Sequence, residues 1–317
     1  MFFDLHCDTL TAIEDVAHGA GQTSVDKLAA LGGAAQCFAI FLDKKQGPLW
    51  PRFEHYCDRL EALMAQDSRL QLALSPDEAL QIVKRGNVAA ILTVEGGDLL
   101  AGDMANLHRL YRRGVRLLTL CWNYPNALGY PNIDCTLPRE QIDVCRTDGR
   151  GLTAFGLDVV DQMNALGMMV DVSHLSDGGF WEALKRSKAP IVASHSNARA
   201  LCGVGRNLSD EMIAALARRG GVMGLCFCYD FLTSGGGEWL DMAVAHARHI
   251  YDVGGADVLA LGSDFDGIPP VAGCDCTALP LLARRLADVL PAEAVDKMLW
   301  SNAMRVWRSV QQYAKSR

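Results

Sequence analysis

The chain has 317 residues, of which 50% are hydrophobic and 21% are charged, so it is long and apolar enough to bury a large core. Its net charge of −7 and the lack of a lysine- or arginine-rich run argue against nucleic acid or an anionic membrane as a partner. We expect a cytoplasmic protein, because no run approaches the ~18–20 apolar residues that cross a bilayer, no secretory segment is visible, and the cysteines lack disulfide spacing.

Short apolar runs alternate with longer amphipathic segments along the whole chain. The runs predict eight strands, over residues 2–8, 35–42, 88–96, 115–122, 168–174, 190–196, 221–228 and 258–267. Helical patterns between them include residues 51–66, 75–86 and 208–220. Ser75 or Asp77 can cap the start of the second helix, and Gly86 follows its last turn. Apolar strands that alternate with helices indicate a parallel sheet covered on both faces, and eight such units favour an α/β fold of the closed (β/α)8 TIM-barrel type.

The chain shows no linker, internal repeat or low-complexity segment that would divide it. We therefore interpret residues 1–317 as a single (β/α)8 barrel domain. The longest irregular stretch, about residues 123–153, follows the fourth predicted strand and is expected to lie over the mouth of the barrel.

Side chains that bind metals or exchange protons gather at the ends of the predicted strands. In chain order they are His6 and Asp8, Glu95, His174, His195, and Asp264 with Asp266. The active site of such a barrel is built where strands end and the following loops begin, so these side chains are expected to meet. Each histidine taken alone is more typical of a core or loop residue. Their joint occurrence at five of eight strand ends indicates a site.

Imidazole nitrogens and carboxylate oxygens are suitable ligands for Zn²⁺ and related divalent ions. Two such ions about 3.5–4 Å apart share a ligand, and a carboxylate can bridge them. In barrel order, Glu95 lies opposite both the His6–Asp8 pair and the His174–His195 pair. The order predicts one ion on His6, Asp8 and Glu95 and another on Glu95, His174 and His195. A hydroxide shared between the ions would be a nucleophile at neutral pH.

Other histidines and cysteines carry less context. His246 and His249 have helical spacing and are expected on a solvated helix face. Cys274 and Cys276 form an isolated Cys-x-Cys pair in a predicted loop, for which a metal role is not favoured.

Six motifs, in chain order, carry a resemblance: "DLHCDT", "TVEGG", "DVSHLS", "SHSNAR", "GRNLSD" and "GSDFDG". With them the sequence resembles the membrane (renal) dipeptidase family of zinc metallopeptidases, in its soluble bacterial-type branch, over essentially the whole chain. The resemblance implies a barrel of the metal-dependent amidohydrolase type that hydrolyses dipeptides with two Zn²⁺ ions, other divalent metals being left open. It places His6 and Asp8 on one ion, His174 and His195 on the other, and Glu95 between them.

The resemblance also implies roles that spacing alone does not give. Arg206, in "GRNLSD", matches the family arginine that binds the free carboxylate of the substrate, a contact suited to the planar guanidinium. Asp264 matches the aspartate near the substrate's amino group, which shuttles a proton to the leaving amine. Asp266 is expected to structure the loop.

Two positions depart from the family pattern, and both are candidate substrate contacts. Trp122 stands where many members carry a histidine, and its indole N–H donates one hydrogen bond but cannot become cationic. After the seventh strand the family often shows Asn-Phe-Tyr, whereas this chain has Cys226, Phe227 and Cys228 followed by Tyr229. These departures leave the exact substrate open.

The leading hypothesis is a metal-dependent dipeptidase that acts on free dipeptides, L,D-dipeptides included. One alternative is another amidohydrolase activity, on N-acyl amino acids or lactones. A second is a catalytically inactive barrel that only binds ligands. The oligomeric state is open, a homodimer being one option.

Overall fold

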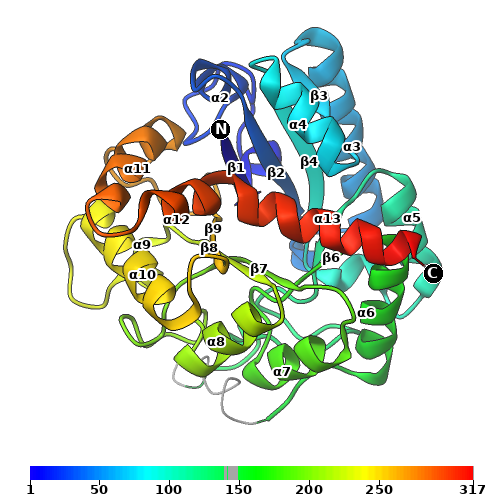
Figure 1. The fold of residues 1–317 in the computed structure, drawn as a ribbon. Helices are drawn as coiled ribbons and strands as arrows, with labels where there is room; N and C mark the ends of the chain where they lie inside the picture. The colour runs from blue at the N-terminus through cyan, green and yellow to red at the C-terminus, as the bar shows by residue number, and fades with distance from the viewer. Residues whose placement is uncertain (139–140, 142–148, 317) are drawn as a thin grey trace.

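The computed structural model describes residues 1–138, 141 and 149–316. Within them, parallel strands close into a (β/α)8 barrel, as predicted, and helices surround it (Figure 1). The strands are β1 (Phe2–Cys7), β2 (Ala34–Phe41), β3 (Leu70–Leu72), β4 (Val88–Glu95), β5 (Leu117–Thr119), β6 (Met169–Asp171), β7 (Val192–Ser196), β8 (Val222–Leu225) and β9 (Leu259–Leu261). Each of the eight predicted strands is present.

The barrel is built by β1, β2, β4 and then β5 to β9, with β9 returning to pair with β1. Strand β3 was not predicted. It is three residues long and pairs with the first part of β4, where Leu70 lies opposite Val88. Strand β5 pairs with the same edge of β4 from Thr93 onward. Strand β3 therefore lengthens the sheet at one point of the barrel wall.

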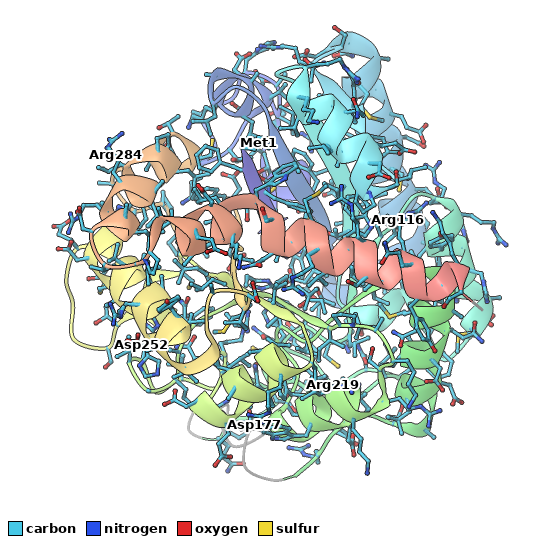
Figure 2. The ribbon with its side chains drawn as sticks, viewed as in Figure 1. Met1, Arg116, Asp177, Arg219, Asp252 and Arg284 are labelled. Atoms are coloured by element: carbon cyan, nitrogen blue, oxygen red, sulfur yellow. The ribbon has the colours of Figure 1, made fainter. Side chains whose placement is uncertain are left out.

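The outer layer consists of helices that follow the strands. They are α1 (Thr9–Ala12), α2 (Val25–Ala30), α3 (Leu49–Gln66), α4 (Pro76–Lys84), α5 (Met104–Arg112), α6 (Ala154–Leu166), α7 (Asp177–Arg186), α8 (Asp210–Arg218), α9 (Tyr229–Leu232), α10 (Trp239–Gly254), α11 (Leu279–Ala287), α12 (Ala292–Asp296) and α13 (Asn302–Lys315). The predicted cap is present, because Ser75 accepts a hydrogen bond from the Glu78 N–H, and Gly86 beyond α4 has a φ of 78°. Charged side chains such as Asp252 and Arg284 lie on the outside of this layer (Figure 2). None of the helices in the described ranges is long and apolar enough to span a bilayer.

Helix α13 lies across one end of the barrel (Figure 1). The buried ring of Phe3 on β1 packs against Trp300 and Trp307, with ring centroids 5.9 and 6.3 Å apart. These rings join the first residues of the strands in one apolar cluster. The amino-terminal end of the barrel is therefore filled, and the opposite end is left for chemistry.

Two strands that reach that end contain a β-bulge. In β1, Asp4 lies opposite Gln36 but Cys7 lies opposite Phe38, so β1 has one residue more than its partner. In β7 the same shift falls between Ala193 and Ser196. A bulge bends a strand and re-aims its side chains. Here the bulged segments carry His6 and His195.

Part of the predicted long loop lies outside the described residues, namely 139–140 and 142–148. Its described part is attached to the carboxyl ends of the strands, since the Asn132 N–H donates to the carbonyl of His174 at 2.7 Å. The Cys135 N–H donates to the carbonyl of Asn123. The single-domain interpretation of residues 1–317 stays a prediction.

Candidate metal centre

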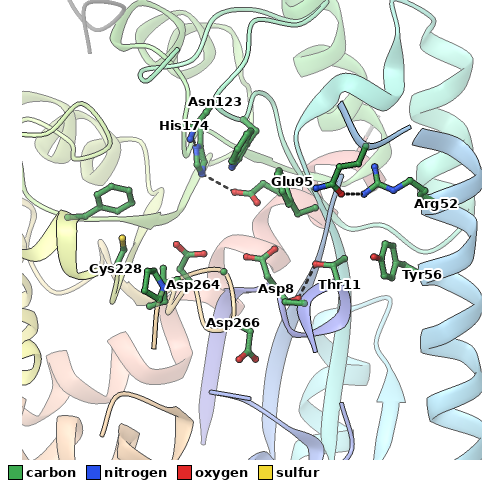
Figure 3. Close-up of a pocket in the computed structure, with 18 residues that line it drawn as sticks. Asp8, Thr11, Arg52, Tyr56, Glu95, Asn123, His174, Cys228, Asp264 and Asp266 are labelled. Carbon is green, nitrogen blue, oxygen red and sulfur yellow. Dashed lines mark hydrogen bonds and ion pairs between the residues drawn. The ribbon is translucent and has the colours of Figure 1, made fainter. Parts of the chain in front are cut away.

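A cavity of about 430 Å³ opens at the carboxyl end of the strands. The cavity is lined by four of the predicted site residues, Asp8, Glu95, His174 and Asp264. Figure 3 shows their side chains converging from different strand ends. His6 and His195 lie behind them, each 1% exposed, with ring centroids 4.0 Å apart. The structure thus brings the five predicted ligands and Asp264 into one cluster.

The carboxylate of Glu95, at the end of β4, stands between two groups of ligands. Its Oε1 lies 2.9 Å from His174 Nε2 and 3.4 Å from His195 Nε2. Its Oε2 lies 3.9 Å from His6 Nε2. On the far side, His6 Nε2 lies 3.3 Å from Asp8 Oδ2. Each oxygen of Glu95 therefore faces a different group, as a bridging carboxylate requires.

Three sets of side chains in the described ranges place their ligand atoms within 4.8 Å of one another. They are His6, Asp8 and Glu95; Glu95, His174 and His195; and His6, His195 and Asp264. The first two sets coincide with the two groups predicted from the sequence. Cys274 and Cys276 are buried and belong to none of the sets.

The protonation states of His174 and His195 indicate whether a cation can bind between the two rings. His174 Nδ1 lies 2.7 Å from Asn123 Oδ1, an acceptor, so Nδ1 carries the proton and Nε2 carries a lone pair. His195 Nδ1 lies 2.8 Å from Ser194 Oγ, whose own hydrogen goes to Asp171, so His195 Nε2 also carries a lone pair. The two Nε2 atoms nevertheless lie 3.0 Å apart. Two lone pairs facing each other beside a carboxylate repel, and a cation between them removes the repulsion.

The pKa shifts agree with this arrangement. Burial lowers the pKa of His174 and of His195 well below the usual range, which keeps both rings neutral and ready to bind a metal. Burial also lowers the pKa of His6, but the carboxylates of Glu95 and Asp8 outweigh it and raise that pKa to about 10. The negative charge of Glu95 and Asp8, which stabilises a proton on His6, would also stabilise a divalent cation bound there.

Asp171, at the end of β6, fixes the histidine side of the cluster and was missed in the sequence. Its Oδ2 accepts from Ser194 Oγ at 2.6 Å and from Thr119 Oγ1 at 2.5 Å, while Oδ1 accepts from the N–H groups of Ser173 and Ser194. Through Ser194 it orients the ring of His195. The signal was present in "DVSH", where an aspartate stands inside an otherwise apolar strand.

Asp264 lies in the loop just beyond β9 on a strained backbone, with a φ of 65°, and His174 has a similar φ of 66°. Asp264 Oδ1 is 3.7 Å from His6 Nε2. Burial raises the pKa of this carboxyl to about 7. A group with this pKa can both hold and release a proton near neutral pH.

Arg206 is 1% exposed and lies behind the cluster. Its Nη2 donates to the carbonyl of His195 at 3.1 Å, and its guanidinium lies 5.2 Å from the ring of Phe231, which lines the cavity. Its Nε and Nη1 are buried with no hydrogen-bond partner among the described residues. Buried donors are normally paired, so a guanidinium with two spare donors indicates a place for an anion.

The remaining candidates behave differently from one another. Trp122 lines the cavity and packs on Phe41, with ring centroids 4.6 Å apart. Tyr229, in contrast, begins α9, and its hydroxyl donates to the carbonyl of Gly237. It is not among the residues that line the cavity, although its neighbours Cys228 and Phe231 are. The predicted contact of Tyr229 with the substrate stays a prediction.

Asp266 and His246 both have structural roles outside the cluster of ligands. Asp266 accepts from Thr9 Oγ1 and from the Gln22 N–H, so it structures the loop as expected. The prediction for His246 is wrong, because this side chain is buried. His246 Nδ1 accepts from the Ala198 N–H at 3.1 Å, and Nε2 donates to the carbonyl of Leu232 at 2.9 Å. It connects the segment after β7 to α9.

Comparisons with known proteins agree with each other. The model of the family described as membrane dipeptidase (Peptidase family M19) matches residues 1–317. The "uncharacterized protein in pqqA 5′ region" of Klebsiella pneumoniae is 36% identical over 261 residues, which cover 80% of this chain and 94% of that protein. An uncharacterized dipeptidase of Schizosaccharomyces pombe is 35% identical over 244 residues, covering 74% of this chain and 56% of the yeast protein. A solved metallo peptidase from Rhodobacter sphaeroides, liganded with a phosphinate mimic of the dipeptide L-Ala-D-Ala, has a TM-score of 0.86 at 26% identity and covers 98% of this chain and 99% of its own.

Proposed function

Because the chain belongs to the membrane dipeptidase family of metallopeptidases (Peptidase family M19), we propose that it is a metal-dependent dipeptidase that hydrolyses the peptide bond of free dipeptides. The observation that carries the proposal is the contact of two histidine lone pairs, at His174 and His195, with one oxygen of Glu95. The dipeptide mimic bound to the Rhodobacter sphaeroides relative supports dipeptides, and L,D-dipeptides among them, as substrates.

We assign the metal ligands by the two groups around Glu95. His6 and Asp8 with Glu95 would hold one Zn²⁺, and His174 and His195 with Glu95 would hold the other. When bound, the ions supply the Lewis acidity that lowers the pKa of water and polarises the scissile carbonyl. Asn123 and Asp171 keep the proton on Nδ1 of the two histidines, directly or through Ser194, so that Nε2 stays free to bind.

Two charged side chains would recognise the ends of the substrate. The Nε and Nη1 groups of Arg206, which have no partner among the described residues, can donate charged hydrogen bonds to the carboxylate of the substrate. Asp264, whose Oδ1 lies 3.7 Å from His6 Nε2, can accept a proton at its carboxylate and pass it to the leaving amine. Trp122 forms an apolar wall beside His174. A site that binds both ends of its substrate favours dipeptides over longer peptides.

The proposal is tested by turnover and metal content together. We expect hydrolysis of free dipeptides, much weaker hydrolysis of their N-acylated analogues, and two Zn²⁺ ions per chain by elemental analysis. A preference for N-acylated substrates or lactones would identify a different amidohydrolase. A chain that binds zinc but hydrolyses none of these compounds would be a binding barrel. We further propose a cytoplasmic location, since the described cysteines are free thiols and most are buried.

A further inference from the structure

Arg52 is the only permanently cationic side chain among the described residues that line the cavity. It belongs to the first turns of α3, the helix that follows β2. Tyr56, four residues later, lies on the same helix face and lines the same wall. Figure 3 shows Arg52 and Tyr56 on one side of the cavity and Asp264 and Cys228 on the other, with Asp8 and Glu95 between them.

The guanidinium of Arg52 is held in place by neutral acceptors. Its Nη1 donates to the carbonyl of Asp43, and its Nη2 donates to Gln46 Oε1, each at 2.9 Å. No carboxylate in the described ranges forms an ion pair with it. Arg113, which lies on the outer surface, pairs instead with Glu54, Asp58 and Glu61. Arg52 is thus oriented by the protein but keeps its charge unpaired.

The acids that line the cavity do not neutralise this charge. Asp8, Glu95 and Asp264 belong to the cluster that would hold the metals and the proton. Asp266 is occupied by Thr9 and by the Gln22 N–H. The hydroxyl of Tyr56, beside Arg52, also has no hydrogen-bond partner in the described part of the chain. This wall therefore offers a fixed positive charge and a neighbouring hydroxyl to whatever enters the cavity.

We propose that Arg52 determines specificity by binding a carboxylate in a side chain of the substrate, so that the preferred dipeptides contain aspartate or glutamate. The inference rests on the dipeptidase function proposed above. The terminal carboxylate of such a dipeptide is assigned to Arg206, beside Phe231 in α9, and the amino group to Asp264. A second carboxylate then meets the wall formed by Arg52 and Tyr56, where a charged hydrogen bond separates the acid from its uncharged amide.

Matched substrates isolate this contact. Ala-Asp is compared with Ala-Asn, and Asp-Ala with Asn-Ala, each in L,L and L,D forms, because the amide keeps the shape of the acid and removes its charge. The variants are Arg52→Gln, Arg52→Lys and the control Lys45→Gln. Lys45 lies in the same turn as Gln46, with its Nζ 4.5 Å from the centre of the Tyr124 ring, and does not line the cavity. The control removes one positive charge from the rim without touching the wall.

For at least one of the two positions, wild type should prefer the acid over the amide roughly ten- to hundredfold in kcat/KM, the worth of a charged hydrogen bond. In Arg52→Gln this ratio should fall to near one, in Arg52→Lys it should be intermediate, and in Lys45→Gln it should equal that of wild type. Because the acid-to-amide ratio of kcat/KM compares two substrates of the same variant, a general loss of activity does not change it. Absence of an acid preference in wild type, or its persistence in Arg52→Gln, would overturn the inference while leaving a dipeptidase. Failure to hydrolyse any dipeptide would refute the proposed function itself.

Discussion

Replacement of Arg206 by methionine separates a substrate-binding role from a structural one. Methionine keeps most of the length of the side chain and removes its charge. The folded protein would lose one charged hydrogen bond to the His195 carbonyl, worth ~1.5–3 kcal/mol, and a cation–π contact with Phe231, worth ~0.5–2 kcal/mol. It would also be relieved of two buried donors without partners, each costing ~1–3 kcal/mol.

These contributions nearly offset each other. We therefore expect the free energy of unfolding of the metal-loaded Arg206→Met variant to differ from that of wild type by less than about 1 kcal/mol. Activity should behave differently, because a substrate carboxylate bound to a buried guanidinium is worth ~2–5 kcal/mol. The kcat/KM for a free dipeptide should accordingly fall roughly 30- to 5,000-fold.

The assay compares a dipeptide with the same dipeptide carrying a terminal amide, together with a denaturant titration of both proteins. Wild type should hydrolyse the acid far better than the amide, and Arg206→Met should hydrolyse both equally poorly. Equal turnover of acid and amide by wild type would show that Arg206 does not read the carboxylate. A variant destabilised by several kcal/mol would show that the spare donors have a structural function after all.

Three other predictions concern the cluster and its support. Glu95→Gln should keep the fold but lose at least one metal and nearly all activity, and elemental analysis that finds two tightly held ions would refute the bridging role. Asp264→Asn should keep both metals while kcat falls roughly 10²–10⁴-fold, and a kcat within a few-fold of wild type would place the proton shuttle elsewhere. Burial lowers the pKa of His246. As the pH falls, the unfolded chain therefore binds a proton at this residue at a higher pH than the folded protein does, and the folded protein loses stability. Relative to His246→Gln, wild type should lose up to about 1.4 kcal/mol between pH 7.5 and 5.5, and parallel stability curves would contradict this.

The strands could be predicted where burial dominates the sequence. Strands β2 and β4 are almost entirely buried, and each end of the predicted ranges lies within one residue of the observed end. Strands β5, β6 and β9 are shorter than predicted, because the residues beyond them leave the ladder to form loops at the cavity. Strand β3 depends on the free edge of β4, which local sequence does not reveal.

The site divides in the same way. His6, Glu95 and His195 could be placed together because the ends of parallel strands converge in a barrel, whatever the details of packing. The support for these residues could not be predicted. The Asp171 network and the bulges in β1 and β7 depend on register, and the burial of His246 depends on how α10 packs against α9. The spare donors of Arg206 likewise become visible only when its surroundings are known.

The packing of α13 against β1 has a consequence for biosynthesis. Strand β1 can pair with β2 soon after both leave the ribosome. Its other edge cannot pair until β9 has been translated, and Phe3 cannot be covered until Trp300 and Trp307 have been translated. At ~5–20 residues per second, translation of the intervening chain takes on the order of 10–50 s. During that time the nascent sheet has an open edge and an uncovered apolar floor. Closure by β9 and by the segment that carries Trp300 and Trp307, rather than formation of any single βα unit, should therefore govern how much of the newly made protein escapes aggregation.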